Sequence, residues 1–194
     1  WPSYYAFILF GSLIALYLYH TSNPDQIIPL WDIKRYLFFY QNYTGLPFHW
    51  SFDHVWSLCV EEHFYILLPI MFLIIQHFIP DKHKIKTLFV FVISAIIAGI
   101  IFKHFSYYLT NSKDTDCATH NRIDALAWGV LLNLIIMYHG EKIKSLKFIL
   151  FTFASGLFIF ITALYFSINY NNILFDKIYF HSIISIAFFL MLLS

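Results

Sequence analysis

The sequence predicts an all-α protein, a polytopic bundle of about six transmembrane helices in one membrane domain. Of its 194 residues, 60% are hydrophobic and 12% are charged, whereas soluble domains carry about 25% charged residues. The hydrophobic residues also gather in long runs, and about 20 such residues suffice for a helix to cross the hydrocarbon core of a bilayer. Because backbone groups in lipid must be hydrogen-bonded within the segment, each run is expected to be a helix.

Six apolar runs lead to this prediction, over residues 4–20, 56–79, 87–105, 123–138, 146–168 and 178–194. No internal repeat or low-complexity linker divides them, so residues 1–194 are taken as a single domain. Since the sequence opens and closes within this pattern, we expect a piece of a longer protein, truncated at both ends. Gly129, inside the fourth run, is interpreted as a helix-packing residue.

The lysines predict the orientation in the membrane. Two short segments, predicted to be loops, hold three lysines each and are separated by two crossings, so they lie on the same side: Lys82, Lys84, Lys86 and Lys142, Lys144, Lys147. The positive-inside rule makes that side cytoplasmic. We therefore expect a multi-pass membrane protein with the long loop over residues 21–55 on the outer side. The formal net charge of +1 gives no basic field for nucleic acid.

Ionisable side chains at the outer ends of two runs are the candidate functional groups. Glu61 and Glu62 lie in the second turn of the second run, and Arg122 and Asp124 open the fourth. Charged groups inside a span cost about 2.5–3.5 kcal/mol each on insertion scales, so they are functional candidates by default. Opposite charges at the same level on two helices predict a shared polar pocket in which Glu61 approaches Arg122.

Helical spacing sorts the residues around the acidic pair. Ser57, Glu61 and Tyr65 are four residues apart and share one polar face, whereas Glu62 falls on a more apolar face. Two alternatives stay open. The acidic residues can act as partners of the helix dipole, and Arg122 can extend towards the interface.

A metal site is a further alternative at this end of the second run. The side chains of His49, Asp53, His54, Glu61, Glu62 and His63 are of types that bind zinc. Their spacing matches no closed motif such as H-E-x-x-H. The sequence therefore predicts no metal.

Three stretches resemble the acyltransferase-3 family of membrane O-acyltransferases. The stretch His54–Pro69, HVWSLCVEEHFYILLP, is similar to the family pattern H-x-W-S-L-x-V-E-E-x-F-Y-x-x-x-P. Arg122–Gly129, RIDALAWG, resembles its R-x-D-x-L-x-x-G signature, and Trp1–Tyr5 resembles the end of its R-I-x-P-x-Y-Y segment. His63 stands where the family most often has glutamine. The chain would correspond to about the third to eighth of some ten spans.

The resemblance implies an enzyme of the bacterial inner (cytoplasmic) membrane. Such an enzyme moves an acyl group, usually acetyl from acetyl-CoA, to a hydroxyl of a cell-surface carbohydrate or glycoside. Acyl-CoA is the donor substrate, and no bound cofactor is implied. The family has an arginine and a catalytic histidine on its first span, which we expect upstream of this sequence. The fragment alone is therefore expected to be inactive.

The resemblance and the residues together give a set of site candidates. Glu61 would orient the missing histidine or contact the acceptor, and Arg122, oriented by Asp124, would bind an anionic group of donor or intermediate. The catalytic candidates are Ser57, Glu61, Glu62 and Arg122; the substrate-binding candidates are His54, Trp56, Tyr65 and Asp124. The rival from another class is a secondary transporter, which also uses intramembrane Glu and Arg, although no inverted repeat with broken helices is seen.

Overall fold

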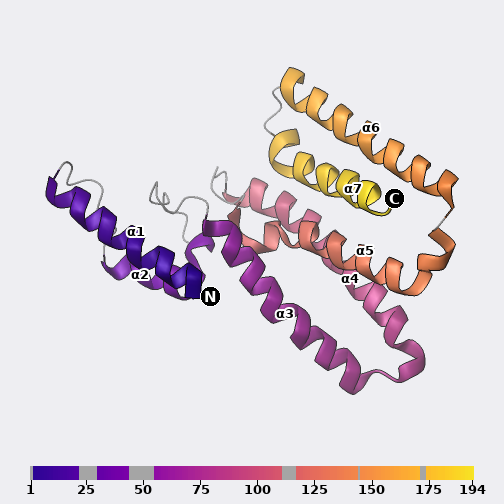
Figure 1. Cartoon of the computed structure of the whole chain (residues 1–194), viewed down its shortest axis with the longest axis horizontal. Helices are drawn as coiled ribbons and strands as arrows, with labels where there is room; N and C mark the ends of the chain where they lie inside the picture. Colours follow the sequence, from indigo (N-terminus) through magenta and orange to yellow (C-terminus); the bar gives the residue numbers. More distant parts are fainter. Residues whose placement is uncertain (1, 22–29, 44–54, 111–116, 144, 171–173) are drawn as a thin grey trace.

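The computed structural model describes residues 2–21, 30–43, 55–110, 117–143, 145–170 and 174–194. These residues form helices and no strand (Figure 1). The helices are α1 (Pro2–Thr21), α2 (Leu30–Leu37), α3 (Trp56–Phe78), α4 (Asp81–Thr110), α5 (Ile123–Ile143), α6 (Leu146–Tyr170) and α7 (His181–Leu192). Short 3-10 helices, η2 (Gln41–Tyr43) and η5 (Thr119–Asn121), and a π-helical segment, η6 (Phe175–Phe180), complete the order.

Five stretches among the described residues are long and apolar enough to cross a membrane. They are α3, Asp81–Leu109 of α4, Ile123–Gly140 of α5, α6, and η6 together with α7. The first predicted run forms α1, where Pro2–Ile14 is a shorter apolar helix. The predicted all-α bundle is confirmed, and its helices are those of a multi-pass membrane protein.

Two segments differ from the sequence prediction. The predicted loop over residues 21–55 contains the helix α2 and the short helix η2. The lysines at 82, 84 and 86 belong to the first turns of α4 and not to a loop, because Asp81 begins that helix and pairs with Lys84 at 2.6 Å. An acidic residue in the first turn suits the helix dipole. At about 1.5 Å per residue, α4 is about 45 Å long, so its first turns extend beyond a hydrocarbon core of about 30 Å.

The helices α4, α5, α7 and α6 pack in that spatial order, and α3 lies against α4 and α5 (Figure 1). The helices α1 and α2 lie side by side at the far end of α3 from its connection to α4. There the Tyr4 hydroxyl donates to the Tyr36 carbonyl oxygen at 2.7 Å, and the Tyr4 and Phe39 rings stack at 4.6 Å. Val55, fully buried just before α3, belongs to the same small core and joins it to the bundle.

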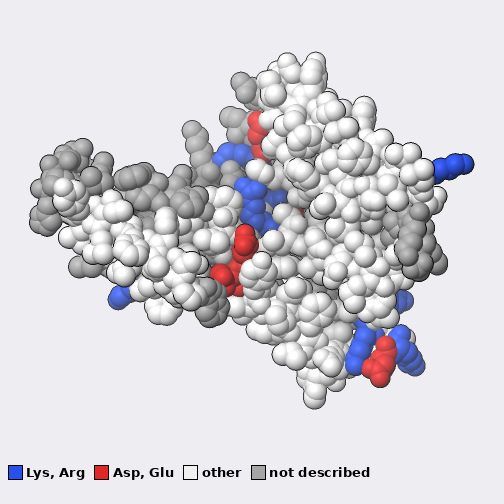
Figure 2. Space-filling view, in the orientation of Figure 1, with Lys and Arg blue, Asp and Glu red and all other residues white. Residues whose placement is uncertain are grey.

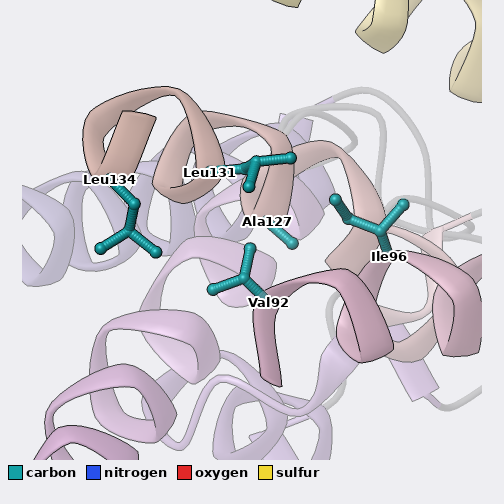
Figure 3. Close-up of a cluster of buried hydrophobic side chains, with 5 residues drawn as sticks. All are labelled: Val92, Ile96, Ala127, Leu131 and Leu134. Atoms are coloured by element: carbon teal, nitrogen blue, oxygen red, sulfur yellow. The ribbon is translucent and has the colours of Figure 1, made fainter. Parts of the chain in front are cut away.

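The contact between α4 and α5 positions the candidate site. Val92 and Ile96 of α4 pack against Ala127, Leu131 and Leu134 of α5 (Figure 3). Along α4 this face continues at the next turns, because residues three and four apart share one side of a helix. The next residues on this face of α4 are Gly99 and then Lys103. Along α5 the packing face leads back to the aspartate at 124.

Glycines let two helix pairs approach closely. A Cβ added at Gly99 would lie 2.9 Å from the Cβ of Asp124, and one at Gly156 would lie 2.7 Å from the Ala187 carbonyl oxygen. The sequence suggested a packing role for Gly129, but a Cβ there meets nothing within 4 Å among the described atoms. The sequence pattern around these glycines does not reveal which helix face meets a partner, so only the packing distinguishes them.

Gly156→Ala is expected to destabilise the contact between α6 and α7. The added methyl group has to displace the backbone of α7, and overpacking of this kind costs about 1–3 kcal/mol. Gly129→Ala is the matched control and should leave stability unchanged or slightly raised, since alanine favours a helix. Thermal unfolding in detergent measures both variants. Equal unfolding temperatures would show that α6 and α7 do not pack as described.

Cysteine labelling tests the predicted topology. In a variant with Cys59 and Cys117 replaced by alanine, Lys82→Cys and Lys147→Cys should be labelled only after the cells are opened. Asn169→Cys, at the opposite end of α6, should react in intact cells, because the positive-inside rule places the lysine-rich ends in the cytoplasm. The opposite pattern of labelling would show that the protein has the inverse orientation in the membrane.

Candidate functional site

Charged side chains gather at one end of the bundle, where α3 and α5 begin, α4 ends and η6 leads into α7. Figure 2 shows a group of red and blue residues near the start of α3, and a second group around the connection from α3 to α4. The surface between them is almost entirely uncharged on this face. Since the two groups lie at opposite ends of α3, the first group is at the predicted outer end.

A buried ion pair joins three helices at this end. The Lys103 ammonium of α4 donates to Asp124 Oδ2 of α5 at 2.6 Å and to Ser182 Oγ of α7 at 2.8 Å. The Ser182 hydroxyl donates to the same carboxylate oxygen at 2.7 Å. The side chains of Lys103 and Asp124 are 5% and 0% exposed, so both charges are taken out of water and depend on one another. Gly99, one turn before Lys103, permits this approach.

Arg122 reaches from the start of α5 to the start of α3. Its guanidinium carbon lies 5.3 Å from the centroid of the Trp56 ring, within the range of a cation–π contact. The backbone N–H of Arg122 donates to the Thr119 carbonyl oxygen at 3.0 Å, which fixes the turn between η5 and α5. The contact brings together the two stretches that resemble family motifs. It also covers one face of the Trp56 indole, which the sequence placed among the substrate-binding candidates.

A polar network ties the loop before α3 to the turn before α5. His63 Nδ1 and Thr119 Oγ1 are hydrogen-bonded at 2.7 Å, and the Asn42 amide donates to the same hydroxyl oxygen at 2.8 Å. Asn42 also donates to the Cys117 carbonyl oxygen at 3.2 Å. His63, at the position where the sequence departs from the family pattern, therefore links α3 to η5.

His120 fills the gap between this network and α4. Its Nε2 lies 3.1 Å from Ser106 Oγ, and the Ser106 hydroxyl lies 3.2 Å from Asn121 Oδ1. The Tyr43 ring stacks on His120 at 5.6 Å, and the Phe102 ring meets its edge at 5.7 Å. Burial lowers the pKa of His120 below its usual value of 6.5, because removal from water disfavours the charged ring. His120 is therefore a neutral hydrogen-bonding group at pH 7.

The two glutamates of α3 are both half-buried. Glu62 lines a cavity of about 300 Å³ between α1, α3 and the segment after α2, with Ser3, Tyr4, Phe7, Phe39, Val55 and Leu58. The face of α3 that carries Glu62, which the sequence described as more apolar, therefore borders this cavity. The Glu62 carboxylate lies in the cavity lining together with mostly apolar residues. The expected approach of Glu61 to Arg122 stays a prediction.

The other predicted residues occupy different settings. Ser57 is half-buried near the start of α3, and Tyr65 is 59% exposed on its outer surface. Asp124 is at the predicted end of the bundle, but its partners are Lys103 and Ser182. His54 lies outside the described residues, as do His49 and Asp53 of the considered metal set. In the part of the chain that the structure describes, no three His, Cys, Asp or Glu side chains are placed to hold a metal ion.

Two residues of this site, Lys103 and Ser182, were not among those that the sequence predicted. Lys103 lies inside the third predicted run, so the insertion cost that singled out Glu61 applies to it equally. Its spacing of seven and eleven residues from Ile96 and Val92 would have placed it on the packing face of α4. Ser182 gave no such signal, since serine is common in membrane helices.

Comparison with known proteins found distant relatives. Over 142 residues, 72% of this chain and 22% of the other, the chain is 26% identical to "Putative O-acetyltransferase SACOL0978" of Staphylococcus aureus (strain COL). It is equally similar to "Putative O-acetyltransferase SA0834" of Staphylococcus aureus (strain N315). Over 105 residues, 54% of this chain and 16% of the other, it is 28% identical to "O-acetyltransferase OatA" of Staphylococcus aureus (strain NCTC 8325 / PS 47).

These relatives are much longer than the chain, which spans about a fifth of their length. No family model matches the chain, and no solved structure matches it. The chain is therefore a multi-pass helical membrane protein with distant similarity to proteins named as O-acetyltransferases.

Proposed function

We propose that this chain is the central part of a membrane-bound O-acyltransferase. The enzyme transfers an acyl group, in the first instance acetyl, from acyl-CoA to a hydroxyl of a cell-surface carbohydrate or glycoside. The distant relatives named as O-acetyltransferases support the reaction class. The observation that carries the proposal is the Arg122–Trp56 contact, because it unites the two motif-like stretches at the predicted outer end of the bundle.

The reaction needs a base, a set of oxyanion donors and a route across the bilayer. The acceptor hydroxyl oxygen attacks the thioester carbonyl carbon, the carbon–sulfur bond breaks, and the hydroxyl proton passes through the base to the departing thiolate. A positioned base accounts for a factor of about 10²–10⁴ in rate. The first-span histidine of the family would be that base, and Glu61 would orient it or bind the acceptor. Arg122 would place a permanent cation beside the negative charge that develops.

Membrane location is part of the proposal. The lysine-rich ends of α4 and α6 face the cytoplasm of a bacterial cell, and the cluster at the opposite ends faces the acceptor. The acyl donor is made in the cytoplasm, so the acyl group or the donor itself has to reach across the bundle.

Transfer can be measured directly with the full-length protein. Cells with and without the gene are compared for acetate released from envelope carbohydrate by mild base, which cleaves O-acetyl esters. Membranes are then supplied with acetyl-CoA labelled in the acetyl group. The proposal expects label in the carbohydrate fraction only when the gene is present. Absence of any acylated product, together with gene-dependent and proton-coupled uptake of a solute, would reject the acyltransferase and establish a secondary transporter.

A further inference from the structure

The cavity that Glu62 lines has the size and composition of a small-molecule site. It measures about 300 Å³ and lies between α1, α3 and the segment after α2. Sites for small ligands enclose about 300–1,000 Å³ and are mostly apolar, with a few polar groups that fix the orientation of the ligand. Besides Ser3 and Glu62, the described lining consists of aromatic and aliphatic side chains: Tyr4, Phe7, Phe39, Val55 and Leu58.

The Glu62 carboxylate lacks a partner of its own. It is half-buried, and in the described part of the chain no hydrogen bond or ion pair reaches it. Within residues 1–81 the only lysine and arginine are Lys34 and Arg35, in the last turn of α2, and neither belongs to the described cavity lining. A partly desolvated carboxylate is best compensated by a cation that also donates hydrogen bonds. The cavity therefore favours a ligand that brings its own positive charge.

The rings of Tyr4 and Phe39 form a fixed aromatic wall beside this carboxylate. The Tyr4 hydroxyl is held by the Tyr36 carbonyl oxygen, and the two rings stack with an interplanar angle of 27°. Phe39 has a φ of 55°, the left-handed conformation that favours glycine after a helix. A bulky residue in this conformation is strained, and such strain gathers at functional sites. The faces of aromatic rings attract cations within about 6 Å.

We propose that this cavity binds the protonated primary amine of an amino sugar in the acceptor. The Glu62 carboxylate accepts a charge-assisted hydrogen bond from the ammonium group, and the aromatic wall attracts the same charge. An acyl chain would take water from Glu62 without replacing its hydrogen bonds. A sugar with hydroxyl groups alone would leave the negative charge unbalanced. The cavity also lies near the start of α3, at the predicted outer end of the bundle, where the acceptor is.

Binding of the amine can be measured without catalysis, although the identity of the ligand as the acceptor rests on the proposed function. Full-length protein in nanodiscs of phosphatidylglycerol, a lipid without an amine, is titrated by calorimetry at about pH 6, where an amine is protonated. Salt at about 0.15 M screens the lipid charge. Methyl glucosaminide should bind at least about tenfold more tightly than methyl N-acetylglucosaminide, which has the same ring without the positive charge.

Three variants test whether Glu62 causes this preference. Glu62→Gln keeps the size of the side chain but removes its charge, so the affinity for the glucosaminide should fall about tenfold. Glu62→Asp keeps the charge and should retain part of the preference. Asp81→Asn, which removes a carboxylate that is 93% exposed beyond the other end of α3, is the matched control and should bind like the parent. The comparison of the two sugars in the parent tests the proposal even if Glu62→Gln does not fold.

The outcomes separate the sources of the amine. Equal affinity for the two sugars, or a preference that survives in folded Glu62→Gln, would overturn the proposal. Phosphatidylethanolamine also carries a primary amine. If this lipid stays bound to the purified parent but not to Glu62→Gln, and the glucosaminide does not bind, the cavity is a lipid site and the proposal is wrong.

The same measurements distinguish this proposal from the proposed function. Glucosaminide binding that depends on Glu62, without acyl transfer to any carbohydrate, would support the cavity and reject the acyltransferase. Acyl transfer to carbohydrate without free amines, at a rate unaffected by Glu62→Gln, would leave the acyltransferase and reject the amino sugar as its acceptor.

Discussion

Replacing Asp124 by alanine is expected to lower the free energy of unfolding by about 3–5 kcal/mol. The change leaves the Lys103 ammonium, only 5% exposed, without its carboxylate counter-ion at the junction of α4, α5 and α7. A charge in that position is costly because burial removes it from the water that would otherwise solvate it. Thermal unfolding of purified protein in detergent, and the amount of protein in the membrane, measure the effect.

The double variant Lys103→Met with Asp124→Leu distinguishes an electrostatic role from a general packing defect. Removing both charges and keeping similar volumes is often neutral or stabilising. We therefore expect the double variant to recover most of the stability lost in Asp124→Ala. Recovery of folding without recovery of acyl transfer would show that the pair also has a role in the reaction. An Asp124→Ala protein that unfolds at the parental temperature would contradict the buried pair.

Glu61→Gln is expected to reduce acyl transfer by a factor of about 10²–10⁴ in the full-length protein. The substitution keeps size and hydrogen-bonding capacity but removes the charge and the proton acceptor. Glu61 is half-buried near the start of α3, about one and a half turns after the Trp56 that contacts Arg122. Membrane abundance should hold, since loss of a carboxylate charge does not itself unfold the bundle.

Glu62→Gln is the matched comparison on the same turn. Glu62 lies about 100° further round the helix and lines the cavity against α1, so its loss should reduce transfer less. Initial rates with labelled acetyl-CoA, corrected for the amount of protein, compare the variants. Unchanged transfer in Glu61→Gln would remove this residue from the mechanism, and loss of transfer together with loss of protein would indicate a structural role.

The bundle could be predicted because lipid leaves few alternatives. Long apolar runs have to be helices, and the six predicted runs correspond to α1, α3, α4, α5, α6 and the η6–α7 unit. Polar segments carry no such constraint. The helix α2 and the extra turns of α4 were therefore missed, since their sequences fit a loop or a helix equally well.

The candidate site was predicted only in part. Insertion cost pointed to Arg122 and Asp124, and the structure places both at one end of the bundle. The insertion cost did not reveal that Asp124 pairs with Lys103, 21 residues earlier, and with Ser182, 58 residues later. The charge of a residue does not identify its partner, because the partner depends on which helix faces pack against each other.

The sequence by itself determined that this protein lies in lipid and which segments form its helices. It also determined at which end of the bundle the candidate charged residues gather. These follow from local composition and from the cost of burying polar groups in hydrocarbon. The tertiary structure decided which charged side chains form an ion pair and which glycine is needed for close packing of two helices. Gly99 lets α4 approach the start of α5, whereas a Cβ at Gly129 would meet nothing within 4 Å among the described residues. That choice depends on packing between segments distant in the chain, and the close-packed contact of α4 with α5 fixes it.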